Sequence, residues 1–375
     1  MENKEKTWNY KFLVLEALGI IFVVMGHNQP INAFFNNVFL FYQFHMALFV
    51  FVSGYFFKDN EVKEFIAKKT KKLIGVYIIW NCIYGIIVNI LKYVNIVNYG
   101  NDFNLYNIFV APFIGSSNQF GFNAPAWFMI SLYFIQLIYF FINKLLNKIK
   151  IKERISTAII TVFFAIIVLK LYQKGLLQSE YWKLLIRVAF LLPFYLLGIL
   201  YKKYEKYDKL NNYFIFTITI IVQAILLQKF GRIDYNLNTF FIGNNYIIYF
   251  IASINGIVFW LRISDIIARH FENNKIIECI GKNTLPIMMH HLFCEFLLNL
   301  IISILNEKIH ILNHFNQVDF QYNIWYKYDN SSNGAINLIY AIIGIVIPIL
   351  IEVKVFNKLR IRGKSKETNN EKITN

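Results

Sequence analysis

The chain has 375 residues, of which 57% are hydrophobic and only 16% are charged, and its mean hydropathy is +0.45. Soluble domains carry about 25% charged residues, so this composition excludes an ordinary soluble protein and indicates a membrane protein. The formal net charge of +16 does not indicate nucleic-acid binding, because the basic residues lie in short segments between apolar runs and not on one amphipathic face.

Ten apolar segments of the chain are long enough to be membrane spans, each of which needs about 20 mostly apolar residues. We expect spans at 12–29, 34–57, 73–97, 126–143, 155–172, 183–201, 213–230, 246–262, 284–306 and 335–353. Because the connections are short, the sequence predicts one all-α polytopic membrane domain, residues 1–359. Residues 360–375 are polar and charged and are predicted to form a disordered cytoplasmic tail.

Six stretches rich in Lys and Arg precede the first predicted span and follow every second one. They are 4–11, 58–72, 144–154, 202–209, 262–282 and 354–372. Positive residues are retained on the cytoplasmic side of a bacterial inner membrane, where they also meet anionic lipids. The pattern therefore predicts a multi-pass protein of that membrane with both termini in the cytoplasm.

The first predicted span carries two ionisable residues, Glu16 and His27. Eleven residues separate them, which is three helical turns plus about 20°, so they share a face and lie about 16 Å apart. Ionisable residues inside a span are functional hypotheses by default. A histidine that only packs in the bundle is the alternative interpretation.

The second predicted span carries His45 in its outer half and Ser53 near its inner end. A dense basic loop follows, with Lys68, Lys69, Lys71 and Lys72. Two interpretations stay open: the loop only determines topology, or its ammonium groups bind a phosphate-bearing cytoplasmic ligand.

The segments 98–126 and 307–334 are poor in positive charge and rich in amides, carboxylates and aromatic rings. Such residues bind sugars by stacking and hydrogen bonding, although an interfacial aromatic belt has the same composition. Trp127 opens the fourth span, and His290 lies in the ninth, beside His291 and Glu295 at i and i+4. A metal site needs at least a third ligand, so we predict none.

Taken together, an ordered set of short motifs resembles acyltransferase family 3, the integral-membrane O-acyltransferases of bacterial surface sugars, and most closely its fucose 4-O-acetylase-like branch. The motifs are Val23-Val24-Met25-Gly26-His27, Phe44-His45-Met46-Ala47-Leu48-Phe49, Ser53-Gly54-Tyr55, the basic loop, Trp127-Phe128, Pro193-Phe194 through Gly198, and Gly281-Lys282-Asn283-Thr284-Leu285-Pro286. The resemblance implies a ten-helix bundle that transfers an acyl group, usually acetyl, from cytoplasmic acyl-CoA to a sugar hydroxyl. It implies no tightly bound cofactor.

The resemblance also implies residue roles. His27 and His45 match the family's histidines, so they are the catalytic candidates, with His27 as general base or, alternatively, acyl carrier. Lys69 and Lys72 match an Arg-x-x-Arg pair thought to hold CoA phosphates, with Lys68 and Lys71 beside them. The candidates for substrate binding and positioning are Ser53, Trp127, Glu16 and His290.

Three positions depart from the family pattern. Glu16 stands where the family has Arg or Lys, so that phosphate contact is expected to fall to Lys11 or to the lysine loop. Ala47 replaces a proline. Lysines replace the arginine pair, which gives point charges without bidentate geometry.

Acyl transfer to an alcohol needs a base, an oxyanion stabiliser and two reactants held together. A histidine suits the role of base near neutral pH. The competing interpretation is a polytopic transporter that exports a polysaccharide or a lipid-linked sugar. A basic loop beside a pore that carries histidines favours the enzyme, because a sugar carrier has no use for a CoA site.

Overall fold

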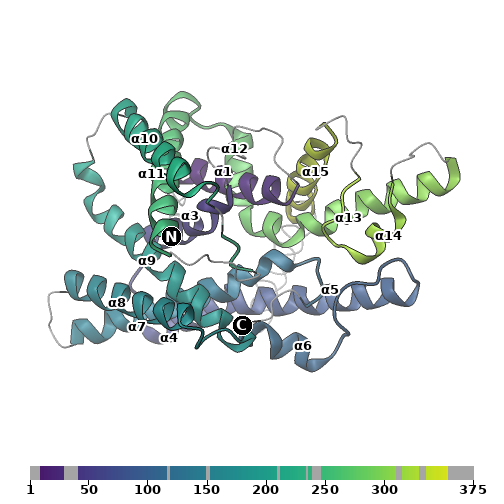
Figure 1. The fold of residues 1–375 in the computed structure, drawn as a ribbon, viewed down its shortest axis with the longest axis horizontal. Coiled ribbons are helices and arrows are strands. Elements are labelled where there is room, and N and C mark those ends of the chain that lie inside the picture. The colour runs from purple at the N-terminus through teal and green to yellow at the C-terminus, as the bar shows by residue number, and fades with distance from the viewer. Residues whose placement is uncertain are drawn as a thin grey trace, which may run out of the picture.

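A computed structural model describes residues 9–28, 41–115, 119–148, 153–208, 212–233, 235–238, 246–309, 315–328 and 335–353 (Figure 1). These residues form helices and connecting turns and contain no β-strand, so the all-α prediction is confirmed for them. The predicted tail at 360–375, the domain boundary at 359 and the first residues of the second predicted span lie outside the described residues.

Seven helices of the described chain are long and apolar enough to cross a membrane. They are α1 (Tyr10–His27), the continuous helix Val62–Tyr93 (α4, η2 and α5), η4 with α7 (Ala124–Lys148), η5–α9–η6 (Glu180–Tyr207), α10 (Asn212–Phe230), α11 (Tyr246–His270) and α13 (Thr284–Ile309). Three further apolar helices are α3 (His45–Tyr55), α8 (Glu153–Gln173), which is apolar over Ala158–Gln173, and α15 (Ala335–Ile351). Small helices α6 (Leu105–Phe109), α12 (Lys275–Lys282) and α14 (Gln317–Tyr322) connect them.

These apolar helices occupy the ten predicted segments, but α3 with 11 residues and α15 with 17 are shorter than a full span of about 20 residues. The count of ten crossings and the cytoplasmic termini therefore stay predictions.

The basic segment before the third span is helical, so its description as a loop was wrong. Residues Val62–Lys69 form α4, and the helix continues through a π-helical stretch, Thr70–Gly75, into α5 (Val76–Tyr93). Lys, Glu and Ala are strong helix formers. The buried ring of Phe65 stacks on Phe140 of α7 at 4.0 Å between centroids, which anchors α4 to the bundle.

Helices α3 and α9 pack with their backbones almost in contact. A Cβ atom added at Gly54 would lie 2.0 Å from the carbonyl oxygen of Tyr195, and one at Gly198 would lie 1.9 Å from that of Phe51. Small residues permit this close approach between membrane helices. The two glycines thereby determine the distance between α3, which carries His45, and α9.

We expect Gly198→Ala to destabilise the protein by about 1–3 kcal/mol or more, because the added methyl group meets backbone atoms that cannot rotate away. Thermal unfolding of the purified protein in detergent measures the effect. Gly75→Ala is the matched control, since its Cβ would come no closer than 3.7 Å to Thr70. Equal melting temperatures for the two variants would contradict the packing argument.

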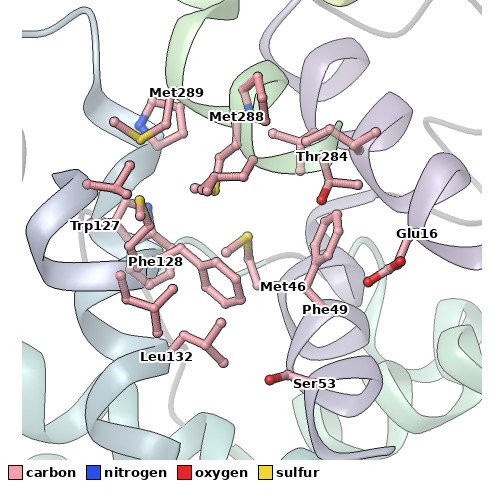
Figure 2. A pocket seen from close by; sticks show the side chains of 18 of the residues that line it. Glu16, Met46, Phe49, Ser53, Trp127, Phe128, Leu132, Thr284, Met288 and Met289 are labelled. Atoms are coloured by element: carbon pink, nitrogen blue, oxygen red, sulfur yellow. The ribbon is translucent and has the colours of Figure 1, made fainter. Parts of the chain in front are cut away.

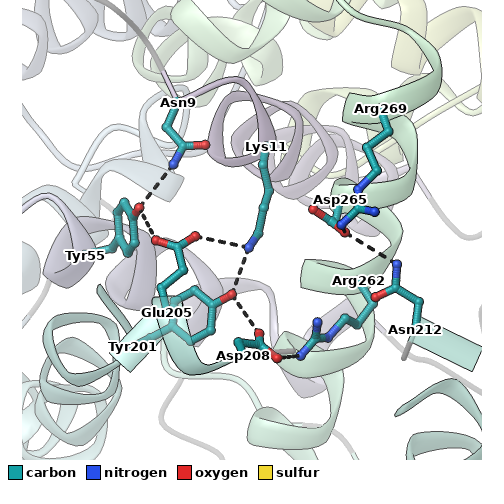
Figure 3. Close-up of polar contacts among 10 residues, drawn as sticks. All are labelled: Asn9, Lys11, Tyr55, Tyr201, Glu205, Asp208, Asn212, Arg262, Asp265 and Arg269. Carbon is teal, nitrogen blue, oxygen red and sulfur yellow. Dashed lines mark hydrogen bonds and ion pairs between the residues drawn. The ribbon is translucent and has the colours of Figure 1, made fainter. Parts of the chain in front are cut away.

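A polar network joins α1, α3 and α9 at the end of α1 opposite His27 (Figure 3). Lys11 Nζ lies 2.8 Å from the Tyr201 hydroxyl and 3.3 Å from Glu205 Oε1. Tyr55 donates to Glu205 Oε2 at 2.7 Å and accepts from Asn9 Nδ2 at 3.1 Å. The charge of Lys11 is therefore engaged by a carboxylate of the bundle.

The same network extends to α11. Asp208 accepts from the Tyr201 hydroxyl at 3.1 Å and forms an ion pair with Arg262 (Figure 3). Asp265 pairs with Arg269 one turn further along α11 at 2.6 Å. These contacts join four helices through groups far apart in sequence.

Candidate active site

A cavity of about 1490 Å³ lies between α1, α3, the α4–α5 helix, α7 and α13. Figure 2 shows Glu16 of α1, Ser53 of α3 and Trp127 of α7 around this space, with apolar side chains between them. The apolar part of the wall includes Met46, Phe49, Phe128, Leu132 and Met288. The wall of the cavity thus combines apolar side chains with many polar and charged groups.

The two ends of the cavity follow from the antiparallel course of α1 and α3. Where α1 begins and α3 ends, the ring of Phe12 stacks on that of Tyr55, with 3.7 Å between the ring centroids. At the other end the Tyr42 hydroxyl donates to the carbonyl oxygen of Gly26 at 3.1 Å, and the Tyr42 ring packs edge-on against His45. His27, the last residue of α1, and His45, the first residue of α3, therefore line the same end.

Five lysines line the opposite end, whereas a sixth lysine of the wall, Lys327, lies at the histidine end, where it pairs with Glu295. Lys58, Lys68, Lys69, Lys72 and Lys282 all contribute to the wall. The helical segment that carries Lys68, Lys69 and Lys72 is held against α7 by two contacts. Phe65 stacks on Phe140, and Thr70 forms a hydrogen bond with Tyr133.

Two of the lysines considered from the sequence do not line the cavity. Lys71 is exposed and is not among the residues of the cavity wall. Lys11 belongs to the network with Glu205, so the expectation that it could replace the missing basic residue of the family is not supported by its position.

Glu16 and Ser53 line the cavity on the side of the lysines. Ser53 accepts a hydrogen bond from Gln136 Nε2 of α7 at 2.8 Å. Glu16 and His27, which were predicted to share a face of their helix, both line this cavity. Glu16 and Ser53 therefore both belong to the wall of the cavity.

Trp127 lines the cavity and packs against a buried arginine that sequence reasoning missed. The guanidinium carbon of Arg187 lies 4.9 Å from the centre of the Trp127 ring. Arg187 donates to the carbonyl oxygens of Leu237, Asn238 and Gly115 at 2.7, 2.8 and 3.2 Å. The sequence did contain a signal for this contact, because Arg187 is a charged residue inside the predicted span 183–201.

His27 contacts a second histidine from a helix far along the chain. Its Nδ1 lies 2.8 Å from Nε2 of His291 on α13, and its ring lies 5.0 Å from the ring of Trp325. Both Trp325 and His27 line the cavity. The two histidines are 264 residues apart in sequence, so no local pattern indicated the contact.

Glu295, one turn beyond His291, holds a buried ion pair. Lys327 Nζ lies 2.7 Å from Glu295 Oε2, an ion pair and not a well-aligned hydrogen bond, and Asn28 Nδ2 donates to Oε1 at 2.6 Å. The side chain of Glu295 is 0% exposed and that of Lys327 is 8% exposed. Lys327 was missed as a partner, although it is one of only two lysines in the segment 307–334.

His290, the residue before His291 on α13, also lines the cavity. A hydrogen bond of 2.7 Å joins its Nδ1 to the Tyr84 hydroxyl, and the Trp80 ring lies 4.2 Å away. Across the described segments, no three His, Cys, Asp or Glu side chains gather as a metal site would require.

A family model described as an acyltransferase domain, that of acyltransferase family 3, matches residues 9–353, nearly the whole chain. The chain belongs to this acyltransferase family. No curated protein and no solved structure matches it significantly. Together with the apolar helices, the family makes this acyltransferase a multi-pass membrane protein.

Proposed function

We propose that this acyltransferase moves an acyl group, in the simplest case acetyl, from acyl-CoA to a hydroxyl of a cell-surface or lipid-linked sugar at the bacterial inner membrane. One observation carries the proposal: a cavity lined by five lysines at one end and by histidines at the other, where the single lysine, Lys327, is paired with Glu295. A donor with anionic phosphates and an extended thioester arm matches that polarity.

The lysine end suits the phosphates of acyl-CoA. Lysine ammonium groups act as point charges that attract phosphate without a fixed geometry. Lys69 and Lys72 of the continuous helix Val62–Tyr93 and Lys282 of α12 line the same end. The thioester arm would then extend past Glu16 and Ser53, whose oxygens can accept hydrogen bonds from the amides of the arm.

The histidine end suits the acceptor. Trp325 offers a ring for stacking on a sugar, and His45 offers a polar contact at the same end as His27. In the reaction the sugar oxygen attacks the thioester carbonyl while His27 accepts its proton. The carbon–sulfur bond then breaks, and the proton passes from His27 to the departing CoA thiolate.

The proposal is tested by comparing a deletion strain, the parent and the complemented strain. We expect the parent's surface glycan to release base-labile acetate and the deletion strain's glycan to release much less per sugar. Thermal unfolding of the detergent-purified protein with and without acetyl-CoA tests the donor separately. A strain that loses the glycan itself, with unchanged acetate per remaining sugar, would favour a transporter.

Neutralising the lysine end should weaken the donor selectively. Exposed charge contacts are worth up to about 1 kcal/mol each. We therefore expect Lys69→Gln/Lys72→Gln to raise the KM for acetyl-CoA about tenfold and to leave the KM for the acceptor nearly unchanged. The difference should shrink at high salt, because screening already weakens the parental contact.

The matched control for this double variant is Lys63→Gln/Lys71→Gln. It removes the same charge from the same helical segment, but neither of its lysines lines the cavity. If both double variants insert less well yet keep the parental KM for acetyl-CoA, the lysines serve topology alone.

A further inference from the structure

We propose that His291 is a positioning residue that holds His27 in one tautomer, with hydrogen on Nδ1 and an unprotonated Nε2 directed to the acceptor. This inference rests on the proposed role of His27 as the base. It concerns which of the two His27 nitrogens accepts the proton and why.

The first step is the proton on His291. Its Nδ1 lies 2.9 Å from the carbonyl oxygen of Ile287, one turn earlier on α13. A carbonyl oxygen only accepts hydrogen bonds, so Nδ1 of His291 must carry the hydrogen. The backbone of α13 thereby determines the tautomer of His291.

The second step is the charge on His291, whose side chain is completely buried. The neighbouring carboxylate of Glu295 already has Lys327 and Asn28 as partners. A second buried cation next to Lys327 would lack a counter-charge of its own, and burying an unpaired charge costs several kcal/mol. His291 is therefore neutral, and its Nε2 is an acceptor.

The third step transfers this constraint to His27. Because Nε2 of His291 accepts, Nδ1 of His27, 2.8 Å away, must donate. Within the described part of the chain, the hydrogen bond of the His27 ring uses Nδ1, and the ring lines the cavity. Nε2 is then the unprotonated nitrogen, as a base requires.

The same contact supports the base after it has acted. When His27 takes the hydroxyl proton, the new N–H bond forms at Nε2, and Nδ1–H keeps its bond to His291. The proton later leaves from Nε2 to the CoA thiolate. His291 orients the ring throughout and exchanges no proton.

Nitrogen NMR of the full-length protein in nanodiscs, labelled with ¹⁵N-histidine, reads the tautomer directly. His27→Gln identifies the His27 signals by their loss. In the parental protein we expect the hydrogen on Nδ1 of His27, and a hydrogen on Nε2 with Nδ1 unprotonated would overturn the proposal. This readout needs no substrate, so it stands whether or not the proposed transfer is observed.

Two replacements of His291 separate orientation from packing. His291→Gln keeps an oxygen that can accept from His27 Nδ1–H, whereas His291→Met fills a similar volume without one. We expect the Met variant to shift His27 toward the Nε2–H form and to lower kcat about 10²-fold with an unchanged KM for acetyl-CoA. The Gln variant should keep the tautomer and recover about tenfold or more of that loss.

His270→Gln is the matched control, because His270 also contacts the carbonyl one turn earlier, Ile266, but is exposed and outside the cavity. Transfer is measured as base-labile acetate on isolated surface glycan. Equal losses in the Gln and Met variants, with an unchanged His27 tautomer, would show a packing role and overturn the proposal. Absence of transfer in the parental protein would count against the proposed function and leave the NMR result to decide this inference.

Discussion

Replacing His27 by Gln or Ala is expected to lower the rate of acyl transfer by about 10²–10⁴-fold, the usual contribution of a positioned general base. The residue ends α1 at the histidine end of the cavity, and its ring contacts His291 and Trp325. These two contacts join α1 to α13 and to the segment that carries Trp325. The glycine packing and the Lys11 network, which join α1, α3, α9 and α11, do not depend on them. The fold should therefore survive the change while turnover does not.

The measurement is acetate transferred to isolated surface glycan, normalised to the amount of folded protein in the membrane. His270→Gln, an identical substitution at an exposed site, should retain parental activity. Near-parental turnover of His27→Gln would remove His27 as the base. Loss of folded protein in His27→Gln would instead support the packing interpretation.

Removing one partner of the Glu295–Lys327 pair is expected to destabilise the protein by about 3–5 kcal/mol, because the remaining group is left charged and buried. Lys327 comes from the segment 315–328 and Glu295 from α13, so the pair holds that segment, with Trp325, over the His27 end. Glu295→Gln and Lys327→Met should each lower the melting temperature. The double variant should recover much of the loss, since no unpaired charge remains.

An exposed pair supplies the control for this prediction. Lys92 Nζ lies 2.8 Å from Asp102, whose side chain is 82% exposed, and this hydrogen bond lowers the pKa of the Asp102 carboxyl. Asp102→Asn should change the melting temperature little, because water replaces the lost partner. Equal shifts for Asp102→Asn and Glu295→Gln would contradict the idea that burial makes the second pair important.

The amino-acid sequence was sufficient for the features that depend on local pattern. Apolar runs of sufficient length predicted the helical membrane architecture, and the ordered motifs indicated the family that the match over residues 9–353 then showed. The helical period placed Glu16 and His27 on one face, and the two residues line one cavity. The same period brought His291 and Glu295 together on α13.

One local feature was misjudged for a reason that the sequence itself contains. The charge of the segment 58–72 led to its description as a loop, although its Lys, Glu and Ala residues favour a helix. Helix formation then selects a face: Lys68, Lys69 and Lys72 line the cavity, and Lys71 does not. A count of positive charges does not tell which of these lysines face the cavity.

The tertiary structure alone decided the contacts between helices that are far apart in the chain. His27 meets His291, Glu295 meets Lys327, and Gly198 meets the backbone of Phe51. Periodicity states which face of a helix is apolar or polar, but it does not state which other helix covers that face or at what rotation. Those choices come from the close packing of the whole bundle, in which backbone approach at glycines and the pairing of buried charges select one arrangement.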